Sequence, residues 1–395
     1  MLDRKSLIDW YRGTRARTRQ LFDIITPDAY YDRPIALRNP IVFYEGHLPA
    51  FSVNTLVKLT LKKPGIHPYF EQIFERGIDP ENEAAVKSPT DLWPPREDVQ
   101  AYGDEADALI ERTLCEDNIE IDGGEAVGTI IEHELMHQET LLYMFHELPY
   151  SKRHSPHPSP LTPHTPGVRG GGRGVRVPIS RGRATLGAPR GSRFGWDNEF
   201  PELQVDVPAF EIDAYNVTNG EYLEYIEATG AKAPHFWTRV KDQWHRRGLF
   251  ELAPLPMNAP VYVTHEEATA YAKWKGARLP SEAEWHRASG DATPEGNFDF
   301  QHWDPVDAGS YAPNEFGIYD LVGNGWEWTS TPFGPFPGFE PMPSYRVYSA
   351  DFFDNAHFVL KGASPVTARE LVRKSFRNWF RPNYPYVYAT FRLAR

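Results

Sequence analysis

Residues 151–174 divide this chain into two parts. The stretch reads SKRHSPHPSPLTPHTPGVRGGGRG, in which proline, glycine and serine are frequent. Proline removes a backbone donor and glycine loses much conformational freedom on folding, so a packed helix or strand is not expected here. We therefore predict a domain at residues 1–150, a flexible linker at 151–174 and a second domain at 175–395. The linker also contains three histidines: His154, His157 and His164. They could bind a metal, but a solvated linker without a specific site is the simpler interpretation.

The first part has the spacing of a helical domain. Apolar or small side chains recur every three or four residues from Asp3 to about Ile25, as on one face of a helix. Further stretches with helical pattern lie near 46–62, at 96–115 and at 124–148. Four helices of this length predict a bundle.

The first of these predicted helices carries a basic run. It contains four arginines: Arg12, Arg15, Arg17 and Arg19. An ordinary solvated helix face is the simpler interpretation, and a role in binding an anionic substrate is the alternative.

The second part has the pattern of an α+β domain in which loops dominate. Short β-rich runs, VRVPI at 175–179 and LQVDVPAFEI at 203–212, are followed by long stretches rich in Gly, Pro and Trp. Helices are expected near 218–229 and 265–276.

Composition excludes several classes of protein. The net charge of −12 argues against a nucleic-acid partner, because phosphate binding needs concentrated Lys and Arg. No window of about 18 apolar residues and no apolar signal segment occurs, so we expect no membrane span and a cytoplasmic location. The single cysteine, Cys115, excludes an internal disulfide and any site built from two thiolates.

The predicted helix at 124–148 carries a metal-binding pattern. Its residues 133–137 read HELMH, the H-E-x-x-H signature of zinc proteases. His133 and His137 share one apolar stripe, so both should point into the helical core, about 5–6 Å apart at Cβ. One ion could then bind both rings. The alternative is a pair of core histidines satisfied by hydrogen bonds, and a third ligand would decide between the two.

Two positions compete for the third ligand. A zinc protease would use Glu134 as general base and needs a ligand soon downstream, but His146 is rotated off the stripe and Pro149 then ends the helix. The upstream candidate is His47 in IVFYEGHLPAFSVNTL, at the predicted start of the second helix. The protease interpretation is therefore disfavoured.

The combination resembles the ergothioneine sulfoxide synthases and the related selenoneine synthases. In that family a damage-inducible-like four-helix bundle precedes a domain of the formylglycine-generating-enzyme type, with a C-type-lectin-like fold. The second part carries the motifs of that domain in their usual order: FGWDNEFP (194–201), NVTNGEY (216–222), ARLPSEAEW (277–285), NEFGIYDLVGNGWEWTS (314–330) and the ending FRNWFRPNY…ATFRLAR. The resemblance covers almost the whole chain and implies an α+β fold.

The resemblance also implies a non-heme Fe(II) site. The family's H-x-x-x-H-x-E motif and one histidine from an early helix correspond here to His133, His137, Glu139 and His47. Three imidazoles on Fe(II) leave positions for O2 and a substrate. Glu139 is expected to orient a ligand rather than to bind iron. Formylglycine generation itself uses copper bound by two cysteines. This chain has one cysteine, Cys115, so that activity is excluded.

The organic acceptor of the resembled family is hercynine, the trimethylammonium betaine of histidine. Asn378 and Trp379 look like the family's acceptor-pocket Asn-Trp, in which the amide could bond the imidazole or carboxylate and the indole could face the ammonium group. A C-terminal core tryptophan beside a turn asparagine is the alternative. Other motif residues are expected to be scaffold without chemistry: Arg278, Glu282, Trp285, Trp326 and Trp328.

Several positions depart from the sulfur-inserting synthases. Those enzymes usually carry an acidic residue after the Asn-Trp pair and a Gln before the second motif histidine, where this chain has Phe380 and Met136. The matching first-domain region holds only Lys87 and Arg96 in place of an Arg-rich stretch. The loop at 331–339 has phenylalanine where a catalytic tyrosine is expected.

An uncharged donor would explain these departures together, and the selenoneine synthases that this chain resembles use one, a selenosugar. A sugar is bound by aromatic faces and neutral hydrogen bonds rather than by arginines. Phe380, Trp93, Tyr384 and Tyr386 are candidates for such contacts. We therefore favour an O2-dependent Fe(II) enzyme that joins selenium of a selenosugar to the imidazole carbon of hercynine. A thiol-using sulfoxide synthase is the main alternative, followed by a zinc protease and a noncatalytic binding protein. Residue patterns assign no catalytic residue and no oligomeric state.

Overall fold

The computed structural model divides the chain into two compact units. The helical unit comprises residues 1–156 together with the short segment Met342–Tyr345, and the C-terminal unit comprises the other residues from 157 onward. The described residues are 3–75, 93–154, 174–290 and 295–395. Most of the predicted linker, with His157 and His164, lies outside them.

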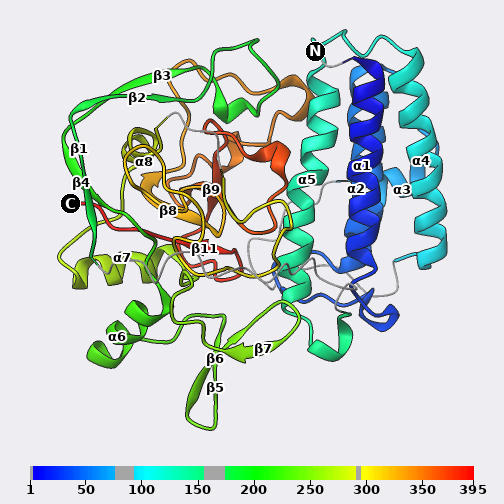
Figure 1. The fold of residues 1–395 in the computed structure, drawn as a ribbon. Coiled ribbons are helices and arrows are strands. Elements are labelled where there is room, and N and C mark those ends of the chain that lie inside the picture. The colour runs from blue at the N-terminus through cyan, green and yellow to red at the C-terminus, as the bar shows by residue number, and fades with distance from the viewer. Residues whose placement is uncertain (1–2, 76–92, 155–173, 291–294) are drawn as a thin grey trace. The chain divides into compact units, whose positions relative to one another are not determined.

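Four long helices make up most of the helical unit (Figure 1). They are α1 (Arg4–Phe22), α2 (Ile41–Ser52), α4 (Arg96–Glu116) and α5 (Glu125–His146). α1 packs against α4 and α5, and α2 packs against the same two helices. The short helix α3 (Pro68–Ile73) was not expected, because six residues are too few to show a helical period.

The second helix begins earlier than residue 46. Pro40 immediately precedes α2, which runs to Ser52 and continues as a π-helical segment, Val53–Thr60. His47 therefore lies in the middle of α2, and the prediction that it starts the helix is wrong. Every residue of α2 except Glu45 is buried, so the helix has no polar face from which its beginning could be read.

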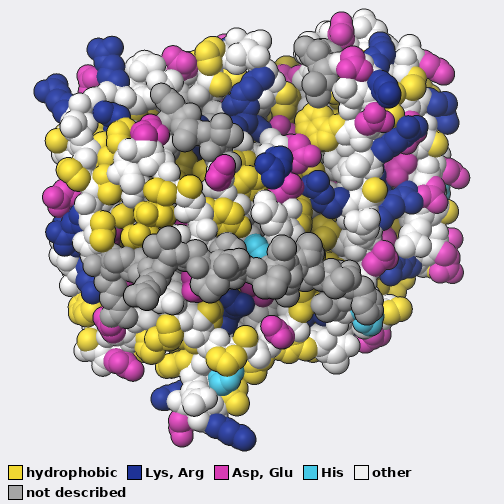
Figure 2. Space-filling model, in the orientation of Figure 1, with side chains coloured by type: hydrophobic (Ala, Val, Ile, Leu, Met, Phe, Trp, Pro, Cys, Tyr) yellow, Lys and Arg dark blue, Asp and Glu magenta, His cyan; other side chains and the backbone are white. Residues whose placement is uncertain are grey.

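Acidic residues of α4 neutralise the basic run of α1. Arg12 bonds Glu111 at 2.5 Å, and Arg19 bonds Asp104 at 2.6 Å. Figure 2 shows basic and acidic side chains interspersed on this part of the surface. Arg15 is buried, so the expectation of a wholly solvated face fails for this residue. Because Arg12, Arg15 and Arg19 are paired with acidic residues, this arrangement argues against a role of these three in binding an anionic substrate.

The C-terminal unit is built from short strands and helices joined by long loops. Its described helices are α6 (Asn219–Thr229), α7 (His265–Trp274) and α8 (Glu282–Ala288), of which the last was not expected. β1 (Arg176–Ile179) pairs with β4 (Phe210–Asp213), and β2 (Gly182–Leu186) pairs with β3 (Leu203–Val207), both antiparallel. A three-stranded sheet has the order β5 (Trp237–Val240), β6 (Gln243–Arg247) and β7 (Leu252–Pro254).

A four-stranded sheet carries the C-terminal motifs. Its order is β10 (Asn378–Phe380), β9 (Phe358–Ala363), β8 (Gly325–Pro332) and β11 (Ala389–Thr390), and only β11 runs parallel to its neighbour. Arg392 and Glu327 form an ion pair of 2.5 Å with both side chains fully buried, which ties the chain's last residues to β8.

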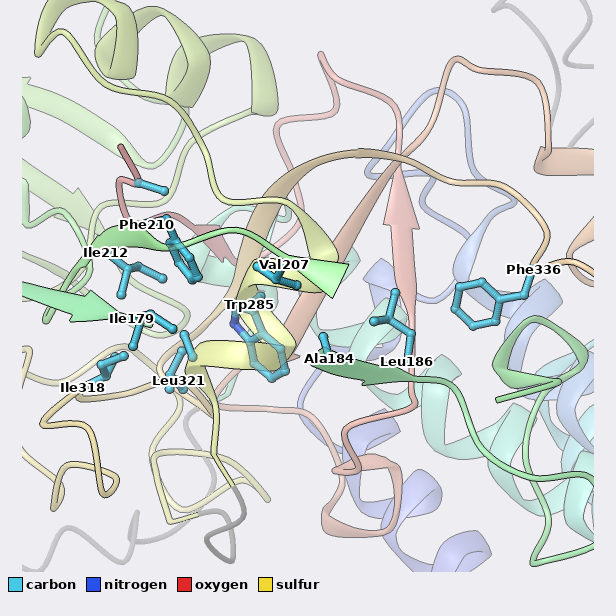
Figure 3. Close-up of a cluster of buried hydrophobic side chains, with 12 residues drawn as sticks. Ile179, Ala184, Leu186, Val207, Phe210, Ile212, Trp285, Ile318, Leu321 and Phe336 are labelled. Atoms are coloured by element: carbon cyan, nitrogen blue, oxygen red, sulfur yellow. The ribbon is translucent and has the colours of Figure 1, made fainter. Parts of the chain in front are cut away.

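The motif residues expected to be scaffold make structural contacts. Trp285 of α8 packs in the cluster of buried apolar side chains in Figure 3. Arg278 bonds Glu284 at 2.6 Å, and Glu282 bonds Arg377 at 2.9 Å. Trp326 and Trp328 are both buried on β8. Among the described residues, no helix is long and apolar enough to cross a membrane.

A buried amine on β9 should make stability depend on pH. The Nζ of Lys361 donates to the carbonyl oxygens of Lys374 and Phe376 at 2.7 and 2.6 Å and lies 3.8 Å from Glu282. Burial lowers the pKa of Lys361 to about 8, although Glu282 acts in the opposite direction. Above pH 8 the folded chain loses this proton while the unfolded chain keeps it up to about pH 10.4, so the free energy of unfolding should rise with pH in that window.

Lys361→Met should abolish this rise. The unfolding free energy of the unsubstituted protein, relative to that of the variant, should increase by about 2 kcal/mol between pH 8 and pH 10 in urea denaturation. The exposed Lys232, changed to Met, serves as the control and should leave the pH dependence unchanged. If the difference in unfolding free energy between the unsubstituted protein and Lys361→Met stays constant across this pH window, the lowered pKa of Lys361 is contradicted.

Candidate metal centre

His47 of α2 lies beside His133 and His137 of α5. One ligand nitrogen of each ring lies within 4.8 Å of the other two. The ring centroids of His133 and His137 are 4.5 Å apart, and His47 is 5.2 and 5.3 Å from them. Within the described parts of the chain, this is the one group of three or more His, Cys, Asp or Glu residues with metal-site spacing. The third histidine that the sequence pattern required is therefore in place beside the helical pair.

The orientation of His47 is fixed from outside the cluster. Its Nδ1 lies 2.8 Å from the carbonyl oxygen of Phe74, at the end of α3. Because a carbonyl only accepts, Nδ1 carries the proton and Nε2 keeps its lone pair for a metal. Gly46 permits this approach, since a Cβ at that position would lie 2.4 Å from the Phe74 ring.

Aromatic side chains cover the histidine rings. Phe51 stacks on His133 with centroids 3.6 Å apart and 12° between planes. Phe43 stacks on His47 at 4.9 Å and 17°. The apolar faces are thus packed, which restricts rotation of both rings and excludes water from them.

The electrostatic environment favours neutral imidazoles. Burial lowers the pKa of His137 well below its usual value, and the charges of His47 and Arg38 act in the same direction. A metal binds the neutral ring, so this shift lowers proton competition for His137. The Nδ1 of His137 is buried without a hydrogen-bond partner, a costly arrangement unless a ligand is present. The three nitrogen donors therefore fit a divalent transition metal such as iron.

Glu134, the glutamate of the H-E-x-x-H pattern, does not belong to this cluster. Its carboxylate accepts from Nη1 of Arg15 at 2.8 Å, and Arg15 also bonds Asp107 at 2.7 Å. Burial raises the pKa of Glu134, and the charge of Arg15 opposes that rise. A general base for peptide hydrolysis would have to face the metal, so this geometry argues against the zinc-protease alternative.

Glu139 and Met136 are neighbours of His137 in sequence but not on its helix face. At 100° per residue, Glu139 is turned about 200° from His137 and Met136 about 100°. Glu139 is buried, and it lies outside the three-histidine cluster. Their expected roles, orienting a ligand and contacting substrate, stay predictions.

Tyr345 is a neighbour of the metal centre that sequence analysis missed. Its ring centroid lies 6.0 Å from that of His133 and 5.1 Å from that of Phe51, both edge to face. Together with Met342–Pro343–Ser344 it is part of the helical unit. The available signal was its closeness in sequence to the 331–339 loop, where a tyrosine was expected at Phe333 or Phe336, at least nine residues earlier.

Four of the residues expected to bind the acceptor or the donor lie on or after β10 of the C-terminal unit: Asn378, Trp379, Phe380 and Tyr384. Trp379 stacks on Phe333 at 4.2 Å and 6°, so one face of the indole is covered. Asn378 uses its side-chain oxygen to accept from the backbone N–H of Trp379 at 2.9 Å. Phe380 stacks on Tyr384 at 5.1 Å and 15°.

The other two aromatic candidates belong to different units. Tyr386 meets Tyr384 edge to face at 5.1 Å in the C-terminal unit. Trp93 is in the helical unit, where it stacks on Phe74 at 5.9 Å. Tyr386 thus extends the pair formed by Phe380 and Tyr384, while Trp93 packs near His47 through Phe74.

Comparison with known proteins identifies the family. Residues 173–395, more than half of the chain, match the sulfatase-modifying factor enzyme 1-like domain. The hercynine oxygenase of Mycolicibacterium smegmatis is 30% identical over 100% of this chain and 99% of that protein. The chain belongs to the hercynine oxygenase family. The predicted resemblance to the ergothioneine sulfoxide synthases is thereby confirmed, as is the α+β fold with a domain of the formylglycine-generating-enzyme type.

Other members of the hercynine oxygenase family and related fungal proteins are also similar. The hercynine oxygenase of Mycolicibacterium thermoresistibile is 33% identical over 68% of each chain. Ergothioneine biosynthesis protein 1 of Neurospora crassa is 27% identical over 96% of this chain but only 56% of its own length. The chain thus spans about half the length of this fungal relative. Membership of an enzyme family makes the chain an oxidoreductase rather than a noncatalytic binding protein.

Glu134→Gln should separate stability from metal binding. The change leaves Arg15 with a weaker buried partner, so the free energy of unfolding should fall by roughly 3 kcal/mol in urea denaturation. Co(II) affinity, measured by visible-absorption titration, should change by less than about twofold. His137→Gln is the contrasting variant and should weaken Co(II) binding at least about 100-fold, because changing a mere neighbour of a ligand costs about 10–100-fold. Loss of Co(II) binding in Glu134→Gln at unchanged stability would contradict the geometry.

Proposed function

We propose that this protein is an O2-dependent Fe(II) enzyme that joins a chalcogen atom of a small donor to the imidazole carbon of hercynine. The observation that carries the proposal is the convergence of His47, His133 and His137 from two helices. The names of its relatives support hercynine as the acceptor.

The three histidines would hold iron as neutral ligands. When bound, Fe(II) would supply the redox chemistry that lets O2 and an electron-rich chalcogen react. The chain's own contribution is to position and to enclose. The carbonyl of Phe74 orients His47, and Phe51 and Phe43 shield the ligand rings from water.

Hercynine recognition is assigned to Asn378 and Trp379. Because Phe333 covers one face of the indole, the trimethylammonium group would meet the other face or the ring edge. Tyr348 and Phe352 also lie next to Trp379, at 5.1 and 5.6 Å between centroids, and extend the aromatic surface available to a quaternary ammonium.

For the donor we propose a selenosugar. Phe380 and Tyr384 form a parallel aromatic pair where a charged residue would suit a carboxylate-bearing thiol. Arg96, a first-domain cation that could have bound a carboxylate, bonds Glu45 at 3.3 Å and lies over Tyr30 at 4.8 Å. Lys87 lies outside the described residues. A neutral donor would need neither cation.

A thiol donor is the second candidate. It is favoured by the relatives themselves, since the proteins that match over most of this chain are named for hercynine oxygenation and ergothioneine biosynthesis, in which the chalcogen is sulfur. The selenium proposal therefore depends on the donor-side residues, and the proposal of hercynine as acceptor does not.

The two donors can be separated in one assay. The protein is loaded anaerobically with Fe(II), mixed with hercynine and one donor, and exposed to O2, and the products are identified by mass spectrometry. We expect a selenium adduct of hercynine with the selenosugar, at a kcat/KM at least about tenfold above that with γ-glutamylcysteine or cysteine. A sulfur adduct formed as fast as the selenium adduct would reject the selenium proposal. Unchanged hercynine with every donor would reject the function.

Phe380→Asp should report on the donor pocket. Loss of the ring removes its stacking with Tyr384, worth about 0.5–1.5 kcal/mol, so kcat/KM for the selenosugar should fall roughly threefold to tenfold, while the KM for hercynine changes little. Phe380→Tyr keeps the ring and should retain most of the activity. If both variants behave alike, or if the effect falls on hercynine instead, Phe380 does not contact the donor.

A further inference from the structure

A four-residue segment far downstream in sequence belongs to the helical unit. Met342–Tyr345 groups with the helices by its contacts, and Pro343–Tyr345 forms a short 3-10 turn. Met342 and Ser344 are buried, whereas Pro343 between them is exposed. The segment is therefore seated by alternate side chains rather than lying loosely on the surface.

Ser344 attaches the segment to the first turns of α5. Its backbone N–H and its hydroxyl both donate to Oε1 of Glu125, at 2.9 and 2.7 Å. Its hydroxyl oxygen also lies 2.9 Å from the hydroxyl of Thr129, one turn further along the helix. Two of these contacts engage a carboxylate and are charge-assisted, which makes them stronger than neutral hydrogen bonds.

These bonds are not needed to cap the helix. Asp122 already accepts from the backbone N–H groups of Gly124 and Ala126 at 3.0 and 2.9 Å, which satisfies donors at the same end of α5. The carboxylate of Glu125 would therefore stabilise α5 equally well if it were exposed to water, as a negative charge in the first turn. Its bonds to Ser344 call for a different explanation.

The explanation lies in the next residue. Tyr345 presents its ring to the edges of His133 and Phe51, while Phe51 covers a face of the same imidazole at 3.6 Å. His133 is thus held by one ring on its face and by a second ring at about 75° to its plane. Residues 125, 129 and 133 lie on successive turns of one side of α5, so a segment fixed to the first two is brought to the third.

We propose that Ser344 is a positioning residue of the metal centre: its bonds to Glu125 and Thr129 hold Tyr345 against Phe51 and His133 and so fix the plane of that imidazole. The inference rests on the proposed metal site and adds to it the segment that keeps one ligand ring in register. Ser344 touches neither metal nor substrate. It acts through Tyr345, as partners that orient a ligand do at metal sites.

Co(II) provides the test without any substrate. Ser344→Ala should weaken Co(II) binding about tenfold in an absorption titration and shift the visible bands of the bound ion, because His133 gains rotational freedom. Ser344→Thr retains the hydroxyl and should restore most of the affinity and the original bands. Asp122→Ala is the matched control: it weakens the same helix end, so its Tm should fall comparably, but its Co(II) affinity and spectrum should match the unsubstituted protein. Equal Co(II) effects in Ser344→Ala and Asp122→Ala would reduce Ser344 to a structural contact and overturn the proposal.

A thermal-unfolding cycle in metal-free protein tests the attachment independently. Tyr345→Ala should lower Tm clearly in the unsubstituted background and much less in the Ser344→Ala background, because the ring is already released there. The same Tm loss in both backgrounds would overturn the attachment, whatever the metal results. Absence of a hercynine product in the donor assay, with both tests passed, would reject the proposed function and leave the role of Ser344 intact.

Discussion

The hydrogen bond between Nδ1 of His47 and the carbonyl oxygen of Phe74 orients the third nitrogen donor of the candidate metal centre. Two histidines one turn apart on α5 can share an ion, but they complete no site without a third donor. His47 supplies that donor only because α2 passes beside α5 and because its outer nitrogen is occupied by a backbone acceptor. The bond assigns the proton to Nδ1 and leaves Nε2 as the donor that faces the other rings. Gly46 is needed for the same hydrogen bond, because a Cβ at that position would clash with the ring of Phe74.

The H-E-x-x-H motif suits different chemistry when its glutamate has a different partner. In a zinc protease that carboxylate faces the metal and activates water. Here Glu134 is turned about 100° from His133 and about 60° from His137 on α5, and it bonds the buried Arg15 of α1, which also bonds Asp107 of α4. The glutamate therefore links three helices, and it is not available as a base beside the two histidines proposed to bind the metal. The helices packed around α5 therefore determine the role of each residue of the motif. Glu134 meets Arg15 of α1, whereas the two histidines meet His47 of α2.

Much of this arrangement follows from the sequence, and the missing parts have identifiable causes. The helices near 3–25 and 96–115 were predicted closely because each has one apolar face with polar residues opposite. The helix at 124–148 is buried on most sides, and its stripe of apolar residues and the proline that follows it indicated its extent. The beginning of α2 was misplaced because that helix is buried on all sides, and α3 and α8 are too short to show a period. His47 was predicted as the third ligand from its imidazole side chain and from the family resemblance, not from helical periodicity. Tyr345 was missed because no local pattern indicates that a turn more than 200 residues after His133 packs beside it.

Aromatic packing, more than charge, distinguishes the residues proposed to contact iron and substrates. Phe51 and Phe43 cover two of the ligand rings, and Phe333 covers one face of Trp379. Such surfaces bind a quaternary ammonium or a sugar face without requiring a counterion. Three of the described arginines are engaged in ion pairs: Arg96 with Glu45, Arg377 with Glu282 and Arg392 with Glu327. A donor carboxylate that relied on one of these three arginines would have to break its ion pair, at a cost of several kcal/mol for a charge left unpaired in a buried site. The proposed preference for a neutral donor therefore depends on the aromatic pair of Phe380 and Tyr384 and on the pairing of Arg96, rather than on a group dedicated to the selenosugar.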